Sequence, residues 1–260
     1  MRLYDCHAHL ADPRLADTLE DHLAAAAAAG VAGILATAAR LGEWDRIEAL
    51  SQRPGLHGAL GLHPFFIDQA TPEIDLAGDL QRRLAANPRL VAVGEVGLDF
   101  YHGRDNAERQ RAVLAAQLTV ARALDRPVVV HNRRSWNEFF GLLREMGIAS
   151  LRGLCHCFNG SREVARQVLD LGLMVSFCGP LTYPRSTHVR AAAAYVPLDR
   201  ILTETDCPDL PPEPCRGGLS LPWHVRYVVE ALAAIKGLTP TAVAEQVEAN
   251  YHDVLGLPRP

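Results

Sequence analysis

The stretch LYDCHAHL, residues 3 to 10, opens the chain with an apolar segment that carries Asp5, His7 and His9 at every second position. In a β-strand these three side chains lie on one face and the intervening residues lie on the other. Taken alone, the pattern fits a strand whose polar face is satisfied by hydrogen bonds. Whether the histidines do more than this depends on what the rest of the chain places beside them.

Seven further β-branched or apolar segments follow, with helical patterns between them. The predicted strands are residues 2–10, 31–39, 56–64, 90–100, 127–134, 152–158, 173–180 and 200–208. Eight strands alternating with helices in 260 residues predict one (β/α)8 barrel, a TIM barrel of the α/β class, as a single domain over residues 1–260. A doubly wound open sheet ranks second, because no G-x-G-x-x-G turn follows the first strand.

The composition excludes some classes of partner. A formal net charge of -4 argues against broad binding to duplex nucleic acid or to anionic membranes. We find no pattern of a signal peptide or of a membrane-spanning segment, and we expect a cytoplasmic protein with no membrane partner and no obligate protein partner. The six cysteines are expected to be reduced, mostly buried thiols rather than a disulfide framework.

Polar residues collect where the predicted strands end, and in a parallel barrel all these ends face the same mouth. They are His7, His9, His63, Glu95, Asp99, His131, His156 and Asp206. Four histidines with two carboxylates form the ligand set of a binuclear metal site. Imidazole and carboxylate together favour two ions of Zn, Mn, Fe or Ni, with Mg a less favoured candidate. In many metal-dependent barrel hydrolases a carbamoylated lysine bridges the two ions, but the chain's single lysine, Lys236, lies beyond the last strand. Glu95 is therefore the acid best placed to bridge them.

Six motifs in fixed order carry a family resemblance: DCHAHL, GLHP, GEVGLD, PVVVHNRR, HCFNGS and ETDCP. Together they resemble the TatD-type metal-dependent hydrolases of the amidohydrolase-like superfamily, over essentially the whole chain. The resemblance implies a first metal held by His7, His9, Glu95 and Asp206, a second held by Glu95, His131 and His156, and a substrate phosphate near His63 and Arg133. The chain departs from the family pattern after the last strand. Nuclease-like members usually have an R-G-x-x-N-E-P motif there, and this chain has Ser220 and Leu221 in place of Asn and Glu.

The expected function is therefore a metal-dependent phosphoesterase or deoxyribonuclease, with single-stranded DNA ends or small phosphoesters as substrates. Asp206 would take the proton of the attacking water, and Glu95 would bridge the ions. Two alternatives stay open: a hydrolase of an amide, ester or lactone on the same metal site, and a metal-stabilised interaction protein without turnover. Four aromatic residues predicted near the mouth are candidates for base stacking, although packing under a loop is the better expectation for each: Tyr101, Trp136, Tyr183 and Trp223.

Overall fold

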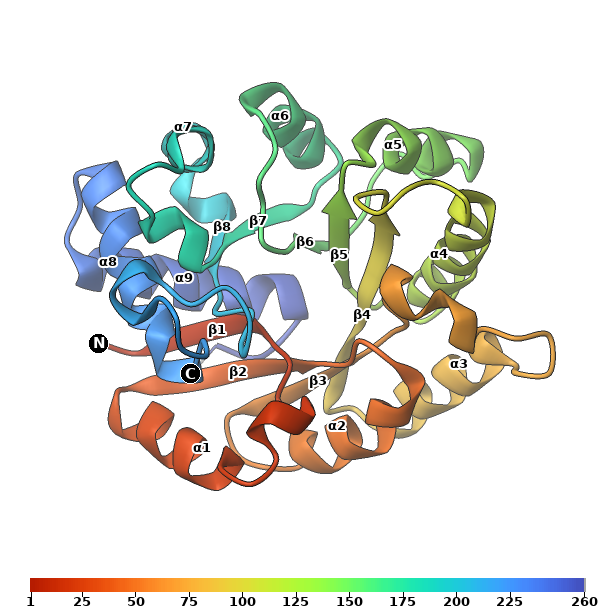
Figure 1. The fold of residues 1–260 in the computed structure, drawn as a ribbon, viewed down its shortest axis with the longest axis horizontal. Helices are drawn as coiled ribbons and strands as arrows, with labels where there is room; N and C mark the ends of the chain where they lie inside the picture. Colours follow the sequence, from red (N-terminus) through yellow and green to blue (C-terminus); the bar gives the residue numbers. More distant parts are fainter. Residues whose placement is uncertain (260) are drawn as a thin grey trace.

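The computed structural model describes residues 1–259, and its sheet confirms the predicted barrel (Figure 1). Eight strands pair in sequence order, and every pair is parallel. The strands are β1 (Leu3–Ala8), β2 (Val31–Thr37), β3 (Leu56–Leu60), β4 (Leu90–Asp99), β5 (Val128–Arg133), β6 (Gly153–Cys155), β7 (Met174–Phe177) and β8 (Ile201–Thr203). Parallel pairing in sequence order is the topology of a (β/α)8 barrel and not of a doubly wound sheet, in which the strand order reverses.

The barrel is closed by contacts between the first strand and the segment that follows β8. Ala8 forms a parallel bridge with Cys207, and the backbone amide of His9 donates to the carbonyl of Cys207 at 2.8 Å. One residue earlier, the amide of Asp206 donates to the carbonyl of His7 at 3.1 Å. Closure therefore places the residues after β8 directly beside the two histidines of the opening motif.

Helices surround the strands in Figure 1 and cover the outer face of the barrel. They are α1 (Leu19–Ala28), α2 (Trp44–Ser51), α3 (Leu76–Ala86), α4 (Ala107–Ala123), α5 (Trp136–Glu145), α6 (Arg162–Asp170), α7 (Thr187–Tyr195), α8 (Val225–Lys236) and α9 (Pro240–Leu255). Among residues 1–259, no single helix is long and apolar enough to cross a membrane. Such length and composition are reached only by joining Pro222–Lys236 with Pro240–Leu255, which are bent by 110°.

Strand β4 shows how the sequence positions the centre of the barrel mouth. All ten of its residues are buried, because a parallel barrel strand packs side chains on both faces. Gly97 pairs with His131 of β5, and a Cβ atom at Gly97 would overlap the carbonyl oxygen of His131. Glycine therefore permits the close approach of β4 to β5 that brings Glu95 within reach of His131.

Candidate metal centre

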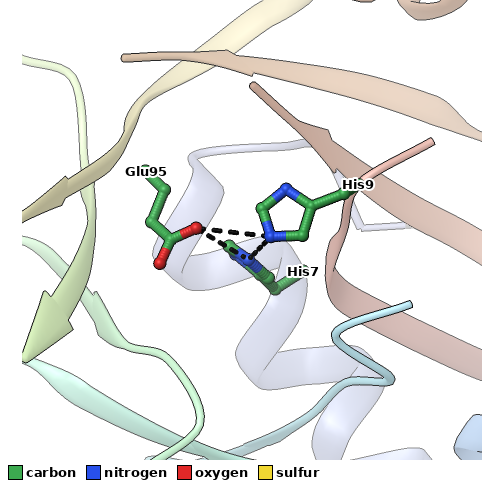
Figure 2. A group of neighbouring side chains, drawn as sticks. All are labelled: His7, His9 and Glu95. Atoms are coloured by element: carbon green, nitrogen blue, oxygen red, sulfur yellow. Dashed lines mark hydrogen bonds and ion pairs between the residues drawn. The ribbon is translucent and has the colours of Figure 1, made fainter. Parts of the chain in front are cut away.

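Glu95 lies at the centre of the predicted cluster, and its two carboxylate oxygens face different histidines. Oε2 lies 3.4 Å from Nε2 of His7 and 3.4 Å from Nε2 of His9, both from the end of β1 (Figure 2). Oε1 lies 2.8 Å from Nδ1 of His131 and 2.7 Å from Nε2 of His156. One buried carboxylate thus separates two pairs of histidines, with one oxygen directed to each pair.

The ring of His9 is oriented by a backbone carbonyl. Its Nδ1 lies 3.2 Å from the carbonyl oxygen of Thr37, which can only accept, so Nδ1 carries the proton. In the neutral ring, Nε2 then presents a lone pair. That atom lies 3.2 Å from Nε2 of His7 and 3.5 Å from Oδ1 of Asp206. The lone pair of His9 therefore faces the Asp206 carboxylate, which is itself an acceptor, as in metal sites whose histidines are held through their second nitrogen.

His131 is oriented in the same way by a carboxylate. Oδ2 of Asp99 accepts from Nε2 of His131 at 2.9 Å, while Oδ1 of Asp99 accepts from the backbone amide of Tyr101 at 2.8 Å. In the neutral ring this leaves a lone pair on Nδ1, which faces Oε1 of Glu95 and lies 3.2 Å from Nε2 of His156. Asp99 is thus a positioning residue for His131, outside the set that would contact an ion.

Asp206, in the segment after β8, is the second carboxylate of the cluster besides Glu95. Its backbone is left-handed, with φ of 53°, a conformation that is unfavourable for a non-glycine residue and recurs at functional sites. Its Oδ1 lies 3.4 Å from Nε2 of His7. The departure at Ser220 leaves this segment in place, because the buried Ser220 hydroxyl donates to the carbonyl of Thr205 at 3.1 Å.

The electrostatics of the cluster favour positive charge between the carboxylates. Burial opposes the charged form of His156, but the neighbouring Glu95 carboxylate raises the pKa of His156 well above its ordinary value. Burial likewise opposes charge on His9, and the hydrogen bond with Asp206 raises the pKa of His9 to about 9. Against burial, the histidines led by His156 hold the pKa of Glu95 well below its usual range. Protons therefore provide positive charge at the positions where metal cations would provide it.

These residues fit divalent cations. Imidazole nitrogens and carboxylate oxygens are suitable ligands for Zn, Mn, Fe and Ni. Ligand atoms lie within 4.8 Å of one another in three groups around the mouth, namely His7, His9 and Glu95; His7, His156 and Asp206; and His63, Glu95 and His131. Nδ1 of His7 and Nδ1 of His156 are buried without a hydrogen-bond partner, so these two rings, unlike those of His9 and His131, are not held through their second nitrogen.

His63 and Arg133 lie at the same mouth, beside a cavity of about 670 Å³ that the cluster lines. Nδ1 of His63 accepts from the backbone amide of Phe65 at 3.0 Å, so Nε2 carries the proton in the neutral ring. That N–H points to Oε1 of Glu95 at 3.3 Å, which suits a hydrogen-bond donor better than a metal ligand. The Arg133 guanidinium carbon lies 3.6 Å from the centre of the Tyr101 ring.

Comparison with known proteins identifies the family of this chain. The family model for the TatD-related DNases matches residues 4–256. The chain belongs to the TatD-related DNase family. It is 37% identical over 255 residues to the uncharacterized metal-dependent hydrolase YcfH of Escherichia coli, covering 96% of this chain and 94% of YcfH. It is 34% identical over 261 residues to human deoxyribonuclease TATDN3, covering 95% of this chain and 92% of that protein.

The fold agrees equally well with a solved member of the family. The crystal structure of YjjV, a TatD homologue from Escherichia coli, superimposes with a TM-score of 0.92 at 31% identity, and the match covers 99% of each chain. Membership over nearly the whole chain, together with the ligand cluster, makes this TatD-family protein a metal-dependent hydrolase.

The structure places the predicted site residues at one mouth of the barrel, where other residues that the sequence analysis missed also line the cavity. Phe65, with 51% of its surface exposed, and Arg40 both line the cavity. A GLHP motif followed by two phenylalanines was the available signal for Phe65. None of the four aromatic residues predicted near the mouth is among the residues that line the cavity, and Trp136 packs against Phe140.

Proposed function

We propose that this TatD-family protein is a phosphoesterase that uses two divalent metal ions and cleaves single-stranded DNA ends or small phosphoesters. The observation that carries the proposal is the position of Glu95, whose Oε2 faces His7 and His9 while Oε1 faces His131 and His156. A carboxylate with a separate set of nitrogens at each oxygen is suited to bridge two cations.

The residues divide into two sets around this carboxylate. His7, His9 and Asp206 would hold one ion with Oε2 of Glu95, and His131 and His156 would hold the other with Oε1. When bound, the two ions supply Lewis acidity, which lowers the pKa of a water molecule and neutralises the charge of a phosphate group. Asp99 and the Thr37 carbonyl would keep the rings of His131 and His9 in the tautomer that binds.

The remaining steps belong to side chains at the cavity. Asp206 lines it and faces His9, so its carboxylate is placed to accept the proton of an attacking water as general base. The Arg133 guanidinium would pair with a non-bridging phosphate oxygen. The Nε2–H of His63 would donate a further hydrogen bond to the substrate phosphate, turning from Glu95.

The size and charge of the site favour a chain end over a long duplex. A cavity of about 670 Å³ lies at one end of a closed barrel and takes a single phosphoester with its neighbouring nucleoside. The net charge of -4 argues against a broad surface that neutralises many phosphates. The name of the human relative, a deoxyribonuclease, supports DNA as the polymer.

One experiment tests the proposal directly. The purified protein is analysed for bound metals, and hydrolysis of bis-(p-nitrophenyl) phosphate, a labelled single-stranded oligonucleotide and p-nitrophenyl acetate is measured for wild type and Glu95→Gln. We expect two metals per chain, with phosphoester and oligonucleotide cleavage lost in the variant. Activity on the acetate ester alone would replace the phosphoesterase with an acyl hydrolase, and a single metal at full activity would contradict the binuclear site.

A further inference from the structure

Two cysteines meet at the cavity wall beside the metal centre. Cys157 follows β6 and Cys178 follows β7, and their Sγ atoms lie 2.8 Å apart. Both line the cavity, Cys157 is partly exposed, and Cys178 is 3% exposed. A small reagent that enters the cavity therefore reaches a pair of thiols that already face each other.

The backbone holds Cys157 in this position. Its φ of 43° is left-handed, and its amide donates to Oε1 of Glu204 at 2.5 Å. The next amide, of Phe158, donates to the carbonyl of Ser176 on β7 at 2.9 Å. An unfavourable backbone conformation held by two hydrogen bonds fixes the Cys157 side chain toward β7, so the contact of the two sulfurs is built into the ends of these strands.

The nearby Glu204 does not turn the pair into a metal site. Its Oε1 accepts from the Cys157 amide, and its Oε2 accepts from the Ser176 hydroxyl at 2.6 Å. Even with Glu204 the group offers three ligand atoms within 4.8 Å of one another, whereas a structural zinc site takes four ligands. The geometry favours a covalent bond between the thiols over a shared ion.

We propose that Cys157 and Cys178 are a site of reversible oxidation, at which a hydroperoxide converts the two thiols into one disulfide. The Cys157 sulfur takes an oxygen atom from the hydroperoxide, which leaves as an alcohol, or as water when the oxidant is hydrogen peroxide. The Cys178 sulfur then attacks the resulting sulfenic acid, the S–O bond breaks, and a second water leaves. Two sulfurs are oxidised by two electrons in total, and the peroxide bond is reduced.

The disulfide would act on the metal centre through the chain itself. Cys157 directly follows His156, whose Nε2 lies 2.7 Å from Glu95. A covalent link between the ends of β6 and β7 draws the Cys157 backbone toward β7 and moves His156 with it. We expect oxidation to lower the affinity of the centre for Zn²⁺ by roughly tenfold or more, which is the loss typical when the orientation of a metal-binding histidine is disturbed.

The test combines peptide mapping with metal binding. Wild type, Cys178→Ala and, as a matched control, Cys215→Ala are treated with hydrogen peroxide and digested with trypsin. We expect residues 153–162 linked to residues 167–185 in wild type and in the control, release of the link by dithiothreitol, and no link in Cys178→Ala. Fragmentation assigns the bond to Cys157, since the same peptide holds Cys155, which is 1% exposed.

Zn²⁺ binding decides whether the link matters, and it does so without any assay of hydrolysis. The expected result is a reversible loss of Zn²⁺ affinity on oxidation in wild type and Cys215→Ala, and none in Cys178→Ala. Oxidation of Cys157 to a sulfinic or sulfonic acid with Cys178 still free would overturn the proposal. So would a disulfide that forms while Zn²⁺ affinity stays the same.

Discussion

Oε1 of Glu95 lies 2.8 Å from Nδ1 of His131, and in the neutral ring both atoms are hydrogen-bond acceptors, because Asp99 holds the other nitrogen of His131. Two acceptors at this distance repel each other unless a cation or a proton lies between them. A second pair of acceptors is formed by Nε2 of His9, whose other nitrogen is held by the Thr37 carbonyl, and Oδ1 of Asp206, which lie 3.5 Å apart. The cluster therefore needs a cation or added protons between its side chains, because the neutral histidines and the carboxylates carry no positive charge.

Glu95→Gln should remove metal binding at both sets of histidines. The amide has the same shape but presents an NH2 group to one set and carries no charge. We expect loss of metal in elemental analysis and a drop in phosphoester kcat/KM of more than about 100-fold. This exceeds the loss typical for residues that only hydrogen-bond to metal ligands. Glu245→Gln, an exposed glutamate on α9, is the matched control and should behave as wild type. Unchanged metal content in Glu95→Gln would contradict a bridging carboxylate.

Asp99→Asn should weaken metal binding without removing a ligand. The asparagine oxygen can still accept from the Tyr101 amide, but its NH2 group then faces Nε2 of His131 and favours the tautomer with the proton on Nδ1. We expect the affinity for the ion at His131 to fall by roughly 10- to 100-fold. Zn²⁺ titration followed by calorimetry measures this. An affinity equal to that of wild type would show that Asp99 does not set the tautomer.

The ligand candidates could be predicted from the sequence because strand periodicity and parallel topology together fix where strand ends lie. His156 illustrates this, since alternation along a barrel strand directs it to the mouth whatever its neighbours are. The tautomer of His63 could not be predicted, because it depends on a hydrogen bond from the Phe65 amide within the following turn. Nor could the contact of Cys157 with Cys178, which requires a left-handed backbone at a non-glycine residue.

Chelation should abolish hydrolysis while the barrel stays folded. The core is built from buried strands and helices whose apolar packing does not involve the metal centre. We expect an unchanged circular dichroism spectrum after chelation, a lower melting temperature that rises with added Zn²⁺ or Mn²⁺, and activity that returns with the metal. Unfolding on chelation would instead favour a metal-stabilised structural protein.

Phe65→Ala should affect substrates that carry a base next to the cleaved bond. The Phe65 ring is half exposed at the cavity and lies 4.7 Å from the His63 ring, centre to centre. Stacking on a base is worth about 1–3 kcal/mol, so KM for single-stranded DNA should rise by roughly fivefold or more. An oligonucleotide with an abasic terminal residue should show no such change. Ile74→Ala, exposed and away from the cavity, is the matched control.

His57 should make the protein less stable as pH falls below its ordinary pKa. Burial, with smaller effects of Arg89 and His252, lowers the pKa of His57 from 6.5 to about 4 in the folded chain. The unfolded chain therefore binds a proton between these two pH values that the folded chain does not, so the free energy of unfolding decreases as pH falls through this window. Above the ordinary pKa both states are neutral and the contribution is constant.

A comparison of wild type with His57→Gln isolates this contribution from that of the metal centre, because His57 lies at the start of β3 and contacts Tyr251 of α9. Urea unfolding at pH 7.5 and pH 5 should show a decrease in free energy that is larger in wild type by about 2 kcal/mol, given 1.36 kcal/mol for each unit of pKa shift. The titrations of the barrel mouth occur in both proteins and cancel in the difference. An equal decrease in the two proteins would mean that His57 is protonated in the folded state already at pH 5.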